Sequence, residues 1–176
     1  MIARLSGAYG RLLAGLALVG CAILLAMMLI IVADVALRNI AVPGLPRGLA
    51  WSNEISELML YLITMTVAPW LLRRGQHIRV DILLQAMPHR LAWYFEWLGD
   101  AIGFVCCGVI AWYGAQAAWS SYVSGAVNIK TLVTPEWWAL APLPITFVLL
   151  EIEMVFRMIR LGHSERGPRH DAVGAA

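Results

Sequence analysis

The chain has 176 residues, of which 61% are hydrophobic and 14% are charged, and its mean hydropathy is +0.74. A soluble domain is about 45–50% apolar and about 25% charged, and a soluble globule this short could not bury so much apolar surface. The composition therefore excludes an ordinary soluble domain and indicates an integral membrane protein, whereas the formal net charge of +2 excludes no class of protein.

The first apolar run, Leu12 to Ala33, contains 22 residues and no charge. At a rise of about 1.5 Å per residue, a helix of this length crosses a hydrocarbon core of about 30 Å. A cleaved signal peptide is the alternative, because two arginines precede the run and the residues LVGC at 18–21 resemble a lipoprotein cleavage box. An uncleaved membrane helix is favoured, because the run continues well past Cys21 and exceeds the roughly 7–15 apolar residues of a signal peptide.

Three further apolar runs predict membrane helices over about residues 55–72, 93–119 and 137–156. The last run contains Pro142 and Pro144, which membrane helices tolerate because neighbouring groups satisfy the freed backbone carbonyls. Tryptophans lie near the predicted helix ends, as in an interfacial aromatic belt: Trp51, Trp70, Trp93, Trp97, Trp119, Trp137 and Trp138.

These runs predict an all-α integral membrane fold with four transmembrane helices. Residues 1–160 would form one four-helix domain, and the polar residues 161–176 would form a disordered cytoplasmic tail. Basic residues set the expected orientation, because positively charged segments stay in the cytoplasm. Ten arginines would lie on one side of the membrane and three basic residues on the other, which places the N and C termini in the cytoplasm. The first set is Arg4, Arg11, Arg73, Arg74, Arg79, Arg90, Arg157, Arg160, Arg166 and Arg169, and the second is Arg38, Arg47 and Lys130.

The densest charge in the chain lies between the second and third helices, in the stretch LLRRGQHIRVDILL at 71–84. Two arginines would end the second helix, and Gly75 permits the turn that follows. Asp81 can cap a short helix that Pro88 ends. We expect a short interfacial segment here, lying on anionic lipid headgroups at the cytoplasmic face. A plain membrane-surface connector accounts for the same features.

Catalytic and cofactor motifs are absent from the sequence. The four histidines lie outside the predicted spans, which excludes a membrane haem held between helices: His77, His89, His163 and His170. Cys21, Cys106 and Cys107 lie in apolar runs without metal-ligand spacing, as buried small side chains do. No phosphate-binding loop or nucleophile–base motif is present. We therefore expect no enzyme activity, no cofactor, no bound metal and no nucleic-acid partner.

Ionisable residues at membrane depth are the remaining functional candidates. Asp34 follows the first span, and Glu54 and Glu57 share a face at the start of the second. Each carboxylate is expected toward a helix end, where its cost is lower than the about 2.5–3.5 kcal/mol of the bilayer centre. Structural pairing or subunit contact is therefore favoured over a transport site for any one of them.

Two more carboxylate pairs lie toward the inner ends of the last two helices. Glu96 and Asp100 share a face at the start of the third helix. Glu151 and Glu153 occupy the fourth, where the spacing predicts an ion pair between Glu153 and Arg157.

Small residues recur along the third helix at spacings that permit close helix packing. Gly99, Gly103 and Cys107 are four residues apart, and Gly114 with Ala118 continues the pattern. The pattern is weak, because glycine is common in membrane helices.

The run WSNEISELMLYLITMTVAPWLLRRGQHIRVDILLQAMPHR resembles the small, DctQ-like membrane subunit of TRAP transporters, the tripartite ATP-independent periplasmic carriers. In that family a Trp and a Glu open the second helix, and a basic turn leads into a His-Ile-x-Val-Asp segment that a proline and a basic residue follow. The matching residues are Trp51, Glu54, Arg73, Arg74, His77, Ile78, Val80, Asp81, Pro88 and Arg90.

The segment TPEWWALAPLPITFVLLEIEMVFR also resembles the last helix of the family, with Pro135 at its start. The resemblance covers most of residues 51–160, whereas the first helix carries no family motif.

The resemblance implies a bacterial inner-membrane protein that acts in uptake of an organic anion, commonly a carboxylate, driven by a cation gradient. A periplasmic binding protein would deliver the anion, and a large membrane subunit would transport it. The small subunit would be a fixed scaffold that helps to seat the binding protein. Candidate structural or partner contacts are Trp51, Glu54, Glu57, Arg73, Arg74, His77, Arg79, Asp81, Glu96 and Asp100. Arg73, Arg74 and Arg79 would hold headgroups or acidic partner residues, while His77 and Asp81 would shape the turn.

Two other functions fit parts of the sequence. A self-contained four-helix exporter of the small multidrug type would rely on a carboxylate deep in its first helix, where this chain has an uncharged run. A membrane anchor subunit of another complex would need only the four spans.

Overall fold

The computed structural model of the chain describes residues 2–40, 48–75 and 88–163. Four long helices account for most of these residues, and a short hairpin and a short helix join the last two. The elements are α1 (Ile2–Asn39), α2 (Ser52–Arg73), α4 (His89–Ser124), β1 (Val127–Ile129), β2 (Val133–Pro135), α5 (Trp137–Leu140) and α6 (Pro142–His163). All four long helices are long and apolar enough to cross a membrane, which confirms the predicted all-α membrane fold.

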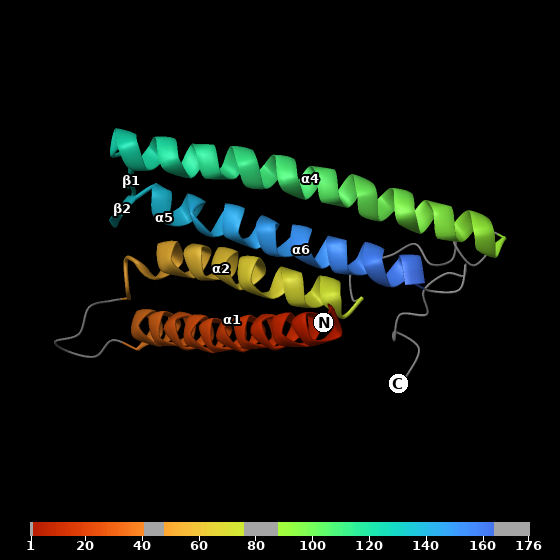
Figure 1. The fold of residues 1–176 in the computed structure, drawn as a ribbon. Helices are drawn as coiled ribbons and strands as arrows, with labels where there is room; N and C mark the ends of the chain where they lie inside the picture. Colours follow the sequence, from red (N-terminus) through yellow and green to blue (C-terminus); the bar gives the residue numbers. More distant parts are fainter. Residues whose placement is uncertain (1, 41–47, 76–87, 164–176) are drawn as a thin grey trace.

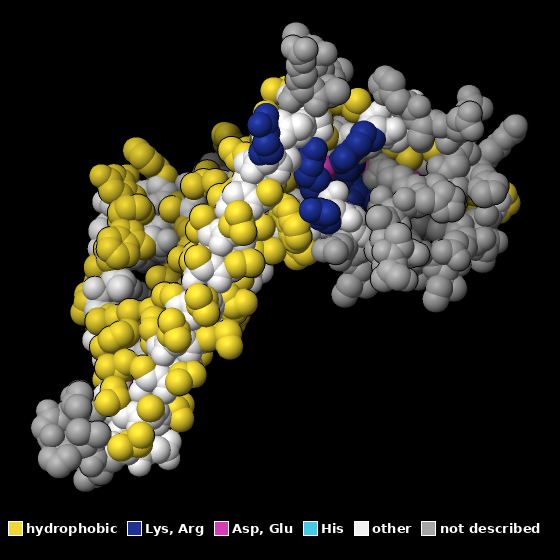
Figure 2. All heavy atoms as spheres, turned by 90° about the horizontal axis from the view of Figure 1, so that it is seen from below, with side chains coloured by type: hydrophobic (Ala, Val, Ile, Leu, Met, Phe, Trp, Pro, Cys, Tyr) yellow, Lys and Arg dark blue, Asp and Glu magenta, His cyan; other side chains and the backbone are white. Residues whose placement is uncertain are grey.

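The long helices lie side by side in the order α1, α2, α6, α4 and form a single row (Figure 1). α1 packs on α2, α2 packs on α6, and α6 packs on α4, so α1 and α4 form the two edges of the row. A row buries little, and the described part of the chain has few buried apolar side chains: Leu13, Ala17, Pro69, Leu72, Ala92, Cys107, Ala111 and Leu161. Figure 2 shows hydrophobic side chains over most of one long side of the molecule, with Lys and Arg gathered toward one end. The exposed apolar surface suits contact with lipid or with another membrane protein.

Two of the helices are much longer than a membrane crossing requires. α1 has 38 residues and α4 has 36, so at about 1.5 Å per residue each is over 50 Å long. The predicted spans 12–33 and 93–119 lie within them, and both helices continue through polar residues. Backbone hydrogen bonds extend a helix wherever the chain permits, whereas hydropathy marks only its apolar part. Helices of this length must tilt or extend beyond the hydrocarbon core.

The fourth predicted span, 137–156, is divided between α5 and α6. The break falls at Ala141, directly before Pro142, and Ala141 N–H still donates to Trp137 O at 2.8 Å. Pro142 and Pro144 carry no backbone N–H, so the hydrogen bonds that residues 142 and 144 would donate in a continuous helix cannot form here.

The β1–β2 hairpin, between α4 and α5, was not expected from the sequence. Gly125 ends α4 in the left-handed conformation, with φ +64°. The strands pair antiparallel, with Val127 opposite Pro135 and Ile129 opposite Val133. Alternating β-branched residues on both sides of a polar turn were the signal that would have predicted this hairpin.

Glycines mark the places where neighbouring helices approach closely. A Cβ on Gly103 would lie 2.9 Å from Met154 Cε, and one on Gly114 would overlap Leu143 Cδ2, which confirms close packing of α4 on α6 at both positions. Close packing is wrong for Gly99, where a Cβ would meet nothing within 4 Å. Gly20 marks a further close contact between helices, which the sequence did not suggest. A Cβ on Gly20 of α1 would lie 2.6 Å from Val67 Cγ2 of α2.

Successive long helices run in opposite directions, so the molecule has two ends at which helices begin or finish (Figure 1). Ion pairs lie at both of these ends. We call the end with the β1–β2 hairpin, the C-terminus of α1 and the N-terminus of α2 the hairpin end. The opposite end, where α2 and α6 finish and α1 and α4 begin, is the arginine end. The functional candidates lie at these two ends.

Candidate functional site

Glu153 is the centre of the arginine end. Its side chain has no exposed surface, and its Oε2 accepts a hydrogen bond from Arg73 Nη1 at 2.9 Å while Oε1 accepts one from Arg160 Nη2. Arg73 also donates through Nη2 to the backbone oxygen and to Oγ of Ser6, at 2.8 and 3.0 Å. One guanidinium therefore joins α1, α2 and α6, and a buried carboxylate of this kind requires such partners.

The predicted pair between Glu153 and Arg157 is wrong. Arg157 instead lies against α4 and α2, with Nε 3.5 Å from Asp100 Oδ1 and Nη1 donating to Leu72 O at 3.1 Å. Leu72 O belongs to the last turn of α2, where it also accepts the Gly75 N–H at 3.1 Å. The partners offered by neighbouring helices outweigh the pairing within one helix, because Arg157 is buried between them.

Tyr9 is a contact at this end that the sequence did not single out. Its hydroxyl donates to Leu149 O at 2.6 Å, and its ring packs on Phe156 with centroids 5.6 Å apart. Arg73 Cζ lies 5.9 Å from the centre of the same ring. An aromatic residue ahead of the apolar run of α1 was the only signal in the sequence.

Glu96 and Asp100, which lie one turn apart on α4, are both buried. Asp100 lies against Arg157 of α6 and so belongs to the charged contacts of the arginine end. Arg74 follows α2 directly, and its Cζ lies 5.1 Å from the centre of the Trp70 ring. The candidates His77, Arg79 and Asp81 lie outside the described residues, as does the predicted interfacial segment.

Glu54 organises the hairpin end. Its carboxylate accepts hydrogen bonds from the backbone N–H groups of Thr131 and Leu132 at 2.6 and 2.9 Å, which holds the turn of the β-hairpin on α2. Glu57, on the same face as predicted, pairs with Lys130 Nζ at 2.8 Å. The hydrogen bond with Glu57 raises the pKa of Lys130 above its usual value. Trp51 immediately precedes α2 at this end.

Asp34 closes the connection between α1 and α2. Its Oδ1 accepts the Leu49 N–H at 2.6 Å, and its Oδ2 accepts a hydrogen bond from Arg38 Nε at 3.0 Å. Gly48 allows this approach, because it adopts φ +98° and a Cβ there would lie 2.8 Å from Arg38 Cγ. Asp34 therefore has a structural role, because it holds Leu49, just before α2, against the C-terminal part of α1.

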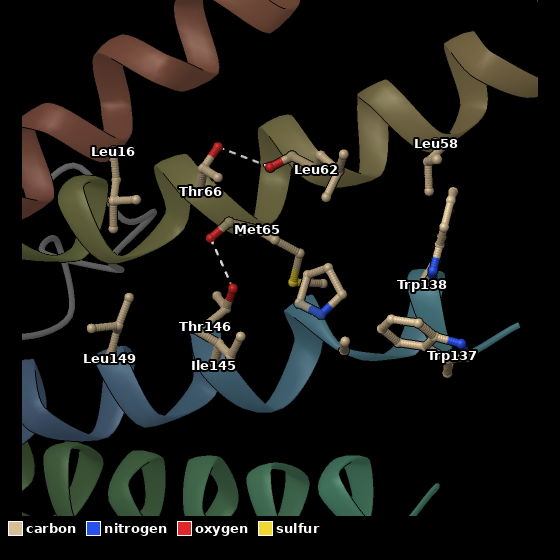
Figure 3. A pocket seen from close by; sticks show the side chains of 12 residues that line it. Leu16, Leu58, Leu62, Met65, Thr66, Trp137, Trp138, Ile145, Thr146 and Leu149 are labelled. Carbon is tan, nitrogen blue, oxygen red and sulfur yellow. Dashed lines mark hydrogen bonds between the residues drawn. The ribbon is translucent and has the colours of Figure 1, made fainter. Parts of the chain in front are cut away.

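An apolar groove of about 450 Å³ lies between the two ends, bounded by α1, α2, α5 and α6 (Figure 3). Its walls include Leu62, Ile145 and Leu149. The Thr66 hydroxyl donates to Leu62 O at 2.8 Å, and the Thr146 hydroxyl donates to Met65 O at 3.1 Å. Since both hydroxyl protons serve the backbone, the groove presents a largely hydrocarbon surface.

The described residues contain no group of three or more His, Cys, Asp or Glu side chains placed to hold a metal ion. The charged groups described above instead make hydrogen bonds and ion pairs between elements of the chain. Their arrangement can hold the helices together and place charge at the hairpin end and at the arginine end.

Comparison with known proteins identifies the family. The family model described as "Tripartite ATP-independent periplasmic transporters, DctQ component" matches residues 27–162, from the middle of α1 to the end of α6. Comparison with curated proteins finds no match for the chain. The matched residues cover more than half of the chain and confirm the predicted resemblance. The chain is therefore a multi-pass membrane protein that belongs to the DctQ family, a family of transporter components and not of enzymes.

Proposed function

We propose that this chain is the small permease subunit of a secondary transporter that takes up an organic anion, of the carboxylate class, with a cation gradient. In this proposal it is a fixed scaffold for the large transporting subunit. Family membership makes the chain a component of a tripartite system. The observation that carries the scaffold role is the bridge from Glu153 to Arg73, which braces three helices with a buried charge.

The distribution of charge supports a static role. A transport site for ions needs carboxylates or polar groups that face a pathway near the membrane centre. Here Asp34, Glu54 and Glu153 are each engaged with another element of the same chain. Glu151 comes nearest to the middle of the row, beside Gly108 of α4.

The shape of the molecule supports a subunit that works against a partner. A single row of helices leaves both broad faces uncovered, and large apolar side chains are exposed along α1 and α4. In this proposal the large membrane subunit packs on one of these faces, and the row of helices stays fixed during transport. Such packing would be stable in lipid through close side-chain contact.

We further propose that the hairpin end faces the periplasm and contributes to the docking surface for a binding protein. The positive-inside rule supports this orientation, because the arginines gather at the opposite end. Ile129 and Val133 are 79% and 67% exposed on a hairpin that Glu54 holds in place. An exposed apolar pair on a rigid support suits a protein contact.

Affinity purification of the tagged chain from native membranes in mild detergent, followed by mass spectrometry, tests the scaffold role. We expect a many-span membrane protein in near equal amount. Recovery of the chain alone, as a homo-oligomer, would contradict the proposal and favour a self-contained exporter. Reporter fusions at the C-terminus and within the hairpin turn test the orientation, because a cytoplasmic C-terminus and a periplasmic hairpin should give opposite signals.

The double change Ile129→Ser and Val133→Ser tests the docking surface. Transport should fall at limiting concentrations of the binding protein and recover at high concentrations, with unchanged yield of the membrane complex. The matched control is Val105→Ser with Val109→Ser, which changes exposed apolar residues of α4 away from the hairpin. Equal transport by the hairpin variant and the wild-type protein at every concentration would exclude this docking surface.

A further inference from the structure

A hollow of about 360 Å³ opens at the arginine end, between α1, α2 and α6. Four arginines line it, and Figure 2 shows Lys and Arg side chains gathered toward one end of the molecule. The remaining lining residues are small or aromatic. The full lining is Gly7, Gly10, Arg11, Ala14, Trp70, Arg73, Arg74 and Arg160.

The hollow carries more positive charge than the carboxylates of the described residues balance. Arg73 and Arg160 share the single buried carboxylate of Glu153. Arg11 and Arg74 pair with no carboxylate within residues 2–40, 48–75 and 88–163, although both belong to the lining. A concentration of guanidinium groups that share so little negative charge favours the binding of an anion.

The geometry of the hollow suits a phosphate group. Guanidinium groups bind phosphate oxygens through paired hydrogen bonds, and several arginines around one concave surface strengthen this selectivity. Three of the four are held in place, Arg73 and Arg160 by Glu153, and Arg74 over the ring of Trp70. A ligand would therefore lose little binding energy to ordering the site.

Small residues on α1 provide the space. A Cβ on Gly7 would meet nothing within 4 Å, so the surface of α1 is open at this point. A Cβ on Gly10 would lie 2.9 Å from Arg73 Nε, so the absence of a side chain lets this arginine cross α1. Gly7 leaves room for the ligand, and Gly10 leaves room for the arginine.

We propose that this hollow is a binding site for the phosphate group of an anionic phospholipid headgroup. The arginines lie where four apolar helices begin or end, which is the depth of the headgroups in a bilayer. Leu5 and Leu12 of α1 are exposed beside it and can contact the acyl chains. Basic pockets between membrane helices bind such headgroups in other proteins. The site stands independently of the transport role proposed above.

The test uses the full chain, with any subunit that purifies with it, in mild detergent after removal of lipid. Native mass spectrometry would measure binding of phosphatidylglycerol, of phosphatidylcholine and of inorganic phosphate, each added separately. The main variant is Arg11→Gln with Arg74→Gln, because neither residue takes part in the ion pairs of Glu153 with Arg73 and Arg160. The matched control is Arg38→Gln with Lys130→Gln, which removes two positive charges at the hairpin end.

We expect the wild-type protein to bind phosphatidylglycerol at least about ten-fold more strongly than phosphatidylcholine, and the main variant to lose this preference. The control variant should keep it. A second variant, Gly7→Leu, should fill the hollow and weaken binding about as much without changing any charge. Binding of inorganic phosphate in place of the lipid would retain the phosphate site and assign it to a soluble anion.

Three results would overturn the proposal. One is equal binding of the two phospholipids by the wild-type protein. Another is equal loss of phosphatidylglycerol in the main and control variants. The third is loss of a partner subunit from the main variant with lipid binding unchanged, since the arginines would then bind acidic side chains of that partner.

Discussion

The hydroxyl of Thr146 donates a hydrogen bond to the backbone oxygen of Met65 at 3.1 Å, and this bond crosses from α6 to α2. In a regular helix the oxygen of residue 65 would accept the N–H of residue 69. That residue is Pro69, which has no N–H, and it lies buried within α2. Thr146 therefore supplies the donor that Pro69 cannot, which is how a membrane helix accommodates an internal proline.

A double-mutant cycle tests this relationship. Thr146→Val should destabilise the folded protein by about 1–2 kcal/mol, because Met65 O would lose its partner in a non-aqueous environment. In the Pro69→Ala background the restored N–H should reduce that cost to nearly zero. Thermal unfolding in detergent measures both. Thr64→Val is the control, since the Thr64 hydroxyl only bonds to Leu60 O of its own helix. An equal cost of Thr146→Val in both backgrounds would remove Pro69 from the explanation.

Loss of the Arg73–Glu153 ion pair should lower the free energy of unfolding more than loss of the Thr146 hydrogen bond does. Arg73→Gln leaves the buried carboxylate of Glu153 with Arg160, whose side chain is 49% exposed. Removal of one partner from a buried ion pair costs about 3–5 kcal/mol, and the remaining arginine should keep the effect near the lower value. The measurement is the free energy of unfolding in detergent.

Arg38→Gln is the matched control for this change. It breaks an ion pair within one helix, and the Arg38 side chain is 54% exposed, so its effect should be below about 1 kcal/mol. Equal stability of the two variants would show that Arg73 does not brace the helices.

The hairpin should depend on Glu54 more than on Glu57. Glu54→Ala removes the acceptor of two backbone N–H groups, at Thr131 and Leu132, whereas Glu57→Ala removes one exposed ion pair. Hydrogen–deuterium exchange of residues 127–135 should therefore speed up by ten-fold or more in the first variant and by less than three-fold in the second, on the order expected for local opening. Similar exchange in both would mean that strand pairing alone holds the hairpin.

The contact of α1 with α2 should not tolerate a side chain at Gly20. Gly20→Ala places a Cβ 2.6 Å from Val67 Cγ2, which forces the helices apart or the valine out of its rotamer. We expect a loss of about 1–3 kcal/mol in stability. Gly15→Ala is the control on the same helix, because a Cβ there meets nothing within 4 Å. Unfolding experiments on both variants would separate packing from helix propensity, which favours alanine at each position.

A scaffold subunit should transport normally without the charge of Glu151. Glu151→Gln keeps the size of the side chain beside Gly108 and removes its charge. Uptake by the reconstituted complex, and its dependence on the driving cation, should stay within about two-fold of wild type, since no coupling ion is expected at this subunit. A loss of cation dependence with unchanged complex yield would contradict the scaffold role and place Glu151 in a transport pathway.

Much of the architecture could be predicted along the chain. The length of each apolar run limits a helix to one membrane crossing, because the bilayer acts on each segment separately. The ends of α1 and α4 were not predicted, since both helices continue through polar residues beyond their apolar runs. The motif from Trp51 to Arg90 predicted the family, because it lies within one continuous stretch of sequence and can be recognised without knowledge of the fold. The loop motif His77 to Asp81 lies outside the described residues, so its predicted role stays a prediction.

The pairing between distant residues could not be obtained in this way. Local spacing predicted Glu153 with Arg157, but Glu153 binds Arg73, which lies 80 residues away, and Arg157 lies against Asp100. Thr146 completes the hydrogen bonding around Pro69 only because α6 packs between α2 and α4. Hydropathy determines which segments enter the membrane, whereas the order of the helices in the row determines which buried charges and carbonyls meet. That order depends on the close fit of side chains such as Val67 on Gly20, which exists only in the packed molecule.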